Sequence, residues 1–135
     1  MYKSKTQIRV RYAETDQMGY VYYGNYAAYY EVARVESLRQ LGLSYRDLEK
    51  EGIIMPVLEN YSRYILPGRY DELLTVIVTI KKKPGFKVVF NYEIFNEEEL
   101  LINIGETKLA FIDTNTGKPC RIPDSMEKVL AEYFM

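Results

Sequence analysis

The segment at residues 25–41 constrains the fold most, because it is a long helix without a polar side. Asn25 is placed to cap its start and Gly42 to end it, which predicts a helix about 25 Å long. Its charged residues are spread around a helical wheel, with apolar residues in every sector between them: Glu31, Arg34, Glu36 and Arg39. A helix without a solvent-facing side is normally surrounded, so we expect the rest of the chain to enclose it.

The rest of the chain is mostly strand-like. Residues 7–12 alternate apolar and basic side chains ahead of the helix, and four more strand candidates follow it, at residues 53–66, 73–82, 86–96 and 100–113. Turns at residues 83–85 and 96–99 join the later strands as an antiparallel meander. The alternation in the last strand changes phase near Gly105, which predicts a bulge or bend there. Pro123 opens a short final helix through Tyr133. We therefore expect a single α+β domain over residues 1–135, an antiparallel sheet wrapped around a long central helix.

Composition excludes several classes of protein. At 135 residues the chain can bury a core without disulfides. It has no apolar run of about 18 residues and its first residues are polar, so neither a membrane span nor a secretory signal is expected, and a cytoplasmic location follows. A net charge of -1 provides no general attraction for nucleic acid.

The chain contains no histidine and one cysteine, Cys120. Catalysis by Ser-His-Asp or Cys-His groups is therefore excluded, as are histidine ligands and a thiolate metal site. Any chemistry has to use carboxylates, tyrosines, lysines or backbone amides. We expect neither a metal nor a redox cofactor.

Asp16 is the carboxylate best placed for chemistry, because it lies in a polar turn shortly before the long helix. The first amides of a helix are unpaired donors with partial positive charge, suited to a carbonyl that becomes an oxyanion. A carboxylate beside such donors is one way to attack an acyl carbon. By spacing alone, the commoner role of a turn aspartate is a local cap or Asx-turn.

The helix carries two further groups of interest. Six of the fourteen tyrosines lie between Tyr20 and Tyr30, and packing in the core or a subunit interface is the expected role of each. Glu31 and Arg34 are three residues apart on the enclosed helix, so we expect them to pair with each other or with neighbours. The alternative is that Glu31 binds a polar group of a substrate.

Two stretches of sequence resemble a known family. VRYAETDQMGYVYYGNY at residues 10–26, with EVAR at residues 31–34, resembles the signature of hotdog-fold acyl-CoA thioesterases of the 4-hydroxybenzoyl-CoA thioesterase type. YILPGRYDEL at residues 64–73 is similar to that family's following loop and strand entry. The resemblance implies dimers with a continuous sheet and active sites between subunits. It also implies that Asp16 is the catalytic aspartate and that the amide of Tyr23, with Gly24 adjacent, polarises the thioester carbonyl.

The sequence departs from this family at two places. Some members have histidine at the position of Tyr23, so only a histidine-independent mechanism is compatible with this chain. Relatives often carry arginine or serine where this chain has four lysines: Lys81, Lys82, Lys83 and Lys87. These lysines either bind the phosphates of coenzyme A or simply solvate a turn.

The expected function is hydrolysis of an acyl-CoA to the free acid and coenzyme A. Asp16 would act as nucleophile or as general base, with Glu31, Lys82, Lys83 and Lys87 binding substrate. Coenzyme A is part of the substrate, so no separate cofactor is needed. We expect a homodimer or homotetramer. The alternatives are a thioesterase for acyl groups on acyl carrier protein, and a non-catalytic hotdog dimer that binds an acyl ligand.

Overall fold

The computed structural model describes residues 1–135 and contains two antiparallel sheets. The main sheet has the strand order β1-β4-β5-β6-β3. Its strands are β1 (Tyr2–Arg9), β3 (Val57–Tyr64), β4 (Leu73–Ile80), β5 (Lys87–Phe95) and β6 (Leu101–Ala110). The small sheet joins β2 (Ile53–Ile54), β7 (Ile112–Asp113) and β8 (Lys118–Pro119). The α-helices are α1 (Asn25–Arg39), α2 (Tyr45–Lys50) and α3 (Asp124–Leu130), and the 3-10 turns are η1 (Tyr12–Glu14) and η2 (Ala131–Phe134). None of the helices has the length and the hydropathy that a membrane span needs.

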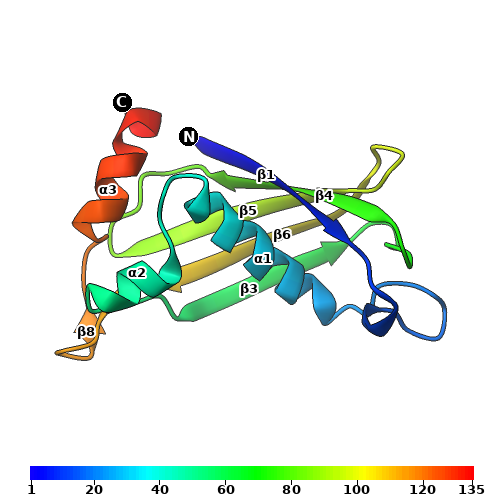
Figure 1. Ribbon diagram of the computed structural model, residues 1–135, viewed down its shortest axis with the longest axis horizontal. Coiled ribbons are helices and arrows are strands. Elements are labelled where there is room, and N and C mark those ends of the chain that lie inside the picture. The colour runs from blue at the N-terminus through cyan, green and yellow to red at the C-terminus, as the bar shows by residue number, and fades with distance from the viewer.

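Helix α1 lies across one face of the main sheet, and the core is the layer between them (Figure 1). The alternation in β4 sends one set of apolar side chains toward the helix: Leu74, Val76, Val78 and Ile80, none more than 1% exposed. Helix α1 buries Tyr26, Tyr29, Tyr30, Ala33 and Leu38 against this face. Burial of each large apolar side chain contributes about 1.5–3 kcal/mol, so this layer holds helix and sheet together. The predicted α+β architecture is confirmed.

The ends of α1 differ from the prediction. Gly24, not Asn25, is the N-cap residue, and no side chain caps the helix. The side-chain amide of Asn25 instead donates to the carbonyl of Glu14 at 2.8 Å. The helix ends at Arg39, and Gly42 adopts a left-handed φ of 84° three residues later. Asn25 was predicted as a cap because its type is common there, whereas its real partner comes from a segment eleven residues earlier.

The expectation that α1 has no solvent-facing side is wrong for the single chain. Four of its residues form an exposed strip: Ala27, Ala28, Glu31 and Val32. The sheet covers only one side of the helix, and no other element lies over this strip (Figure 1). The strip is therefore largely apolar surface that one copy of the chain leaves open.

The strands lie close to the predicted ranges. Three differ. The first strand is β1, which begins earlier, at Tyr2, and ends at Arg9. The segment at residues 53–66 divides into β2 and β3 around Pro56, and the segment at residues 100–113 divides into β6 and β7. Strand β1 extends toward the N-terminus because it pairs with all of β4, from Tyr2 opposite Ile80 to Arg9 opposite Leu73. Pro123 caps α3 rather than being its first residue.

The predicted bulge exists in β6, but it lies at Ile102 and not at Gly105. Asn103 pairs with Ile94 and Leu101 with Phe95, so Ile102 is the extra residue. Gly105 is regularly paired on both sides. A side chain at Gly105 would overlap the ring of Tyr30, which packs directly on the backbone there.

Candidate functional site

Asp16 lies in the turn of a short hairpin that leads from β1 to α1. The two arms are joined by a bridge between Thr15 and Val21 and by the amide of Asp16, which donates to the carbonyl of Tyr20 at 2.8 Å. The second arm continues directly into the helix. This hairpin places the Asp16 turn and the start of α1 at the same end of the molecule (Figure 1).

The Asp16 carboxylate has one occupied oxygen and one without a partner. Oδ1 accepts hydrogen bonds from the amides of Met18, at 2.9 Å, and Tyr20, at 3.2 Å. The Asx-turn considered above is therefore present. Oδ2 accepts no hydrogen bond within the chain. It belongs to a half-buried side chain beside an open depression of about 720 Å³, which Tyr12 and Tyr70 also line.

The helix start provides two unpaired backbone donors. The amide of Asn25 donates to the carbonyl of Tyr22 at 2.9 Å, whereas the amides of Tyr23 and Gly24 donate to no atom of the chain. The partial positive charge of the helix N-terminus adds to these two donors. Tyr23 is 63% exposed, and Gly24 is also an exposed residue. Together the two amides could bind an oxygen that gains negative charge.

Tyr23 and Gly24 do not line the depression beside Asp16. No hydrogen bond joins either residue to Asp16 in the single chain. Instead the Tyr23 ring lies edge-on to the ring of Tyr64 in β3, with centroids 6.4 Å apart. The structure therefore brings the carboxylate and the amides onto one hairpin, but not into one enclosed pocket.

The loop between β3 and β4 supports the second arm of the hairpin. The carbonyl of Gly68 accepts from the amide of Val21 at 2.8 Å, and the amide of Gly68 donates to the Tyr26 hydroxyl at 3.4 Å. The guanidinium of Arg69 lies 4.8 Å from the centre of the Tyr20 ring, within the range of a cation–π contact. The two stretches that carried the family resemblance thus contact each other.

Glu14 has a role that was not predicted from the sequence. Its carboxylate accepts from the Tyr29 hydroxyl at 2.9 Å and pairs with the guanidinium of Arg11 at 3.0 Å. Burial alone raises the pKa of Glu14, but the amide and guanidinium of Arg11 and the hydroxyl of Tyr29 outweigh burial, so this pKa lies below its ordinary value. Burial and the Glu14 carboxylate both raise the pKa of Tyr29, so Tyr29 keeps its proton and donates. The sequence feature that could have indicated this role is the three-residue spacing of Arg11 and Glu14, just before Asp16, which suits an ion pair.

Glu31 and Arg34 were expected to pair with each other or with neighbours, and only Arg34 does so, with neighbours. Arg34 is 7% exposed and donates to the hydroxyls of Tyr45, at 3.1 Å, and Tyr92, at 3.4 Å. Glu31 lies on the exposed strip of α1 and forms no ion pair. Of the two side chains, Arg34 is thus the buried one, and the tyrosine hydroxyls accept its hydrogen bonds.

The predicted lysines gather around one depression of about 570 Å³. Its lysines are Lys81, Lys82, Lys83, Lys87 and Lys108. The turn between β4 and β5, which carries Lys81, Lys82 and Lys83, lies at the opposite end of the main sheet from the start of α1 (Figure 1). Lys83 pairs with Glu127 at 3.2 Å, and Lys108 pairs with Glu59 at 3.0 Å. Lys82 and Lys87 form no ion pair. Within a single chain, the lysines and Asp16 therefore lie at different depressions.

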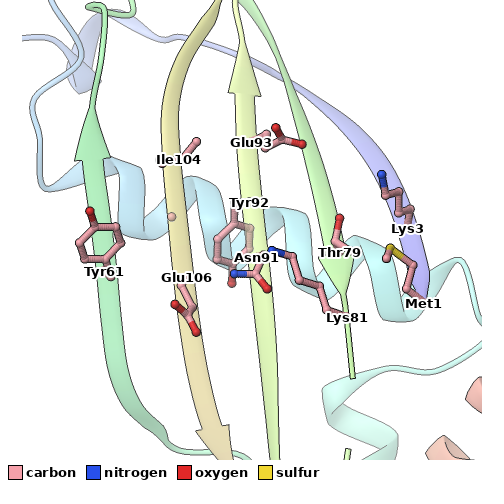
Figure 2. Close-up of a pocket in the computed structure, with 11 residues that line it drawn as sticks. Met1, Lys3, Tyr61, Thr79, Lys81, Asn91, Tyr92, Glu93, Ile104 and Glu106 are labelled. Atoms are coloured by element: carbon pink, nitrogen blue, oxygen red, sulfur yellow. The ribbon is translucent and has the colours of Figure 1, made fainter. Parts of the chain in front are cut away.

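A further hollow of about 440 Å³ lies on the sheet face away from α1 (Figure 2). Lys3 and Lys81 border it on one side, and Glu93 and Glu106 reach it from β5 and β6. Of the residues considered in the sequence for catalysis or substrate binding, Lys81 alone lines this hollow. No group of three or more His, Cys, Asp or Glu side chains in the chain is arranged to hold a metal ion.

Comparison with known proteins places the chain in a family. The profile of the thioesterase-like superfamily matches residues 10–130. YneP of Bacillus subtilis is 41% identical over 120 residues, covering 88% of this chain and 86% of YneP. The acyl-CoA thioester hydrolase YbgC of Escherichia coli is 34% identical over 126 residues, covering 93% of this chain and 92% of YbgC.

Solved structures agree with this assignment. The DHNA-CoA thioesterase of Staphylococcus aureus superposes with a TM-score of 0.85 at 41% identity, covering 98% of this chain and 87% of that chain. The sheet, the long helix and the hairpin before the helix therefore form the hotdog fold, as the sequence predicted. The chain belongs to the thioesterase-like superfamily and is a thioester hydrolase.

Proposed function

We propose that the protein hydrolyses acyl-CoA thioesters with Asp16 as the reacting carboxylate and the amides of Tyr23 and Gly24 as oxyanion donors. The observation that supports this assignment is that one hairpin carries both a carboxylate oxygen without a partner and two unpaired amides at a helix start. The similarity to YbgC, an acyl-CoA thioester hydrolase, supports coenzyme A as the thiol. No histidine is needed, and the chain has none.

Two routes use these groups. In one, Asp16 Oδ2 attacks the thioester carbon, coenzyme A leaves as its thiolate, and water cleaves the resulting anhydride to the free acid and Asp16. In the other, Asp16 takes a proton from water, whose oxygen attacks the same carbon and expels the thiolate. Both routes place negative charge on the carbonyl oxygen. Loss of a single donor to such an oxygen typically costs about 2.7–4 kcal/mol.

The Asp16→Asn variant tests this proposal. Asparagine keeps the Oδ1 acceptor of the Asx-turn but loses the charge, so we expect an unchanged fold and a kcat at least about a hundredfold lower. Asp113→Asn is the matched control, since Asp113 Oδ1 accepts from the amide of Asn115 in a similar turn at 2.8 Å. An Asp16→Asn variant that releases coenzyme A at the parent rate would contradict the proposal.

The acyl group is proposed to lie against the exposed rings of Tyr23 and Tyr64. The two rings contact each other edge-on and are 63% and 52% exposed, and Tyr23 carries one of the unpaired amides. Flat aromatic acyl groups suit such an edge. The likeness to the S. aureus DHNA-CoA thioesterase also favours an aromatic acyl group. A panel of 4-hydroxybenzoyl, dihydroxynaphthoyl and alkyl CoA esters, assayed by thiol release, tests this preference, and faster turnover of alkyl esters would reject it.

We propose a homodimer in which a second copy covers β3. Strand β3 is an edge of the main sheet, and seven of its eight residues are exposed, including Val57, Leu58 and Tyr61. An open apolar edge is a template for pairing with another chain. The exposed strip of α1 is a second open apolar surface, and a partner copy can cover both. Sedimentation of a monomer at micromolar concentration would contradict this proposal.

The lysine depression is proposed to bind the phosphates of coenzyme A. We expect the Lys82→Ala/Lys83→Ala/Lys87→Ala variant to raise KM for CoA esters more than KM for short N-acetylcysteamine thioesters, which lack phosphates. Lys5→Ala and Lys50→Ala, which remove exposed lysines elsewhere, are the controls. Equal changes of KM for the two thioesters would reject phosphate contact. The same acyl group on coenzyme A and on acyl carrier protein, assayed in parallel, separates the two thiol carriers.

A further inference from the structure

The carboxyl group of Glu14, which has no role in the proposed chemistry, connects the segment that carries Asp16 to helix α1. Oε1 of Glu14 accepts from the amide of Arg11 and from the hydroxyl of Tyr29, both at 2.9 Å. Oε2 accepts from the Arg11 guanidinium at 3.0 Å. The Glu14 side chain is only 12% exposed. Glu14 thereby links the chain leaving β1 to the second turn of α1.

The backbone of Glu14 adds two more links. Its carbonyl accepts from the amide of Tyr22 and from the side-chain amide of Asn25, each at 2.8 Å. Tyr22 precedes the proposed oxyanion donors, and Asn25 follows them. Glu14 itself is two residues before Asp16. Glu14 therefore binds the chain on both sides of Tyr23 and Gly24. In this way it connects the arm that carries Asp16 to the segment that carries the oxyanion donors.

We propose that Glu14 is a positioning residue that holds Asp16 at a fixed place relative to the amides of Tyr23 and Gly24, acting through Tyr29 and Asn25. This inference rests on the proposed function, because it requires Asp16 and these amides to act on one thioester. A displacement of about 1 Å between reacting groups can cost a hundredfold in rate. Since no contact joins Asp16 directly to the donors, their separation depends on the bonds between the two arms. Glu14 makes three of these bonds, beside the Thr15–Val21 bridge and the bond from the Asp16 amide to Tyr20.

A buried acceptor suits this task. Tyr29 is 2% exposed, so its hydroxyl has no access to bulk water and depends on the Glu14 carboxylate. Loss of the Glu14 carboxylate leaves the Tyr29 hydroxyl buried and unsatisfied, and loss of either partner removes one bond between the arm and α1. A structural anchor of this kind changes how fast a bound thioester reacts rather than how tightly it binds.

The Tyr29→Phe and Glu14→Gln variants test the proposal by steady-state kinetics on an acyl-CoA that the parent hydrolyses. We expect Tyr29→Phe, which removes one oxygen, to lower kcat roughly tenfold with KM within about twofold. Glutamine keeps an acceptor for Tyr29, so Glu14→Gln should lose less than Glu14→Ala. Glu36→Gln is the control, since Glu36 pairs with Arg39 at 3.2 Å on the same helix. Unchanged kcat in Tyr29→Phe, or a loss confined to KM, would overturn the proposal.

A double-mutant cycle separates positioning from general damage to the fold. If Tyr29 acts by positioning Asp16, the Tyr29→Phe loss should largely disappear in the Asp16→Asn background. If Tyr29→Phe lowers kcat by the same factor in the wild-type and the Asp16→Asn backgrounds, the proposal is overturned. Full activity of Asp16→Asn alone would instead remove Asp16 from the mechanism, so the two failures are distinguishable. If Glu14→Ala fails to fold, the kcat of Tyr29→Phe still tests the proposal.

Discussion

Tyr30 and Gly105 determine how closely α1 approaches the sheet. The Tyr30 ring stacks on Tyr92 with centroids 4.2 Å apart, and its hydroxyl bonds to Ser62 and Asn103. Tyr30 is fully buried, so its hydroxyl needs these partners, and the same ring end lies where a side chain at position 105 would be. Glycine is thus required at position 105 because the Tyr30 ring leaves no room for a side chain, and not because of a turn.

Gly105→Ala should lower the free energy of unfolding by about 1–3 kcal/mol, because the new methyl group overlaps the Tyr30 ring. Gly85→Ala is the matched control, since a methyl group there would meet no atom within 4 Å and the φ of Gly85 is not left-handed. The control should change stability by less than about 0.5 kcal/mol. Urea unfolding measures both, and equal values for the two variants would contradict this account of Gly105.

Glu14 makes stability depend on pH in a defined direction. Its pKa is lower in the folded than in the unfolded chain, so its contribution is complete above the ordinary glutamate pKa and is lost as pH falls through the lowered one. We therefore expect wild type to exceed Glu14→Gln in stability at pH 7, and the difference to shrink as the pH falls below the ordinary glutamate pKa. Urea unfolding across this range provides the measurement, and a difference that grows on acidification would contradict the assignment.

At the scale of elements, β3 and α1 each leave an apolar surface open. Seven of the eight β3 residues are exposed, whereas β4 and β5, in the middle of the sheet, bury alternate residues. The other edge strand, β1, is different, because charged or polar side chains occupy its exposed positions: Lys3, Lys5, Gln7 and Arg9. Strand β3 exposes four apolar or aromatic residues beside three polar ones, Glu59, Asn60 and Arg63. The two edges thus differ in chemistry, and β3 offers the more apolar surface to a partner.

Leu58→Lys should weaken the proposed dimer at least about tenfold, because it places a charge on the apolar edge of β3. Leu58 is 49% exposed, so the folded chain itself tolerates the change. Gln7→Lys on β1 is the control and should leave association unchanged. Sedimentation equilibrium over a concentration series compares them, and an equal effect of the two variants would argue against pairing through β3.

At the scale of the whole molecule, the proposed catalytic and phosphate-binding groups lie at opposite ends of the main sheet. Strand β4 alone separates them by eight residues, or about 26 Å. Two chains paired antiparallel through β3 about a twofold axis would bring the lysine end of one copy toward the Asp16 end of the other. The lysines would then bind the coenzyme A whose thioester lies at the partner's Asp16.

Mixing two defective proteins tests this arrangement. After subunit exchange between Asp16→Asn and Lys82→Ala/Lys83→Ala/Lys87→Ala chains, half of the dimers are mixed. If a site uses Asp16 from one chain and lysines from the other, each mixed dimer has one intact site, and activity at low substrate should rise to about a quarter of wild type. Activity no higher than the average of the two parents would place both groups in the same chain.

The sequence by itself determined the order of the long helix and the main strands, their approximate segments and the position of Asp16 in a turn before that helix, because alternation, turn residues and helix breaks are local properties of the chain. Helix α2 and the small sheet were not predicted. It also excluded histidine chemistry outright. The same local patterns placed a phase change in β6 within three residues of the observed bulge.

Only the tertiary structure decided which groups meet. Arg34 bonds to two tyrosines and not to Glu31, and Asn25 bonds to Glu14 instead of capping its helix. The lysines and Asp16 were likewise found at opposite ends of one sheet. These pairings join residues distant in sequence or on different elements, and their energies depend on burial and separation, which no local pattern encodes.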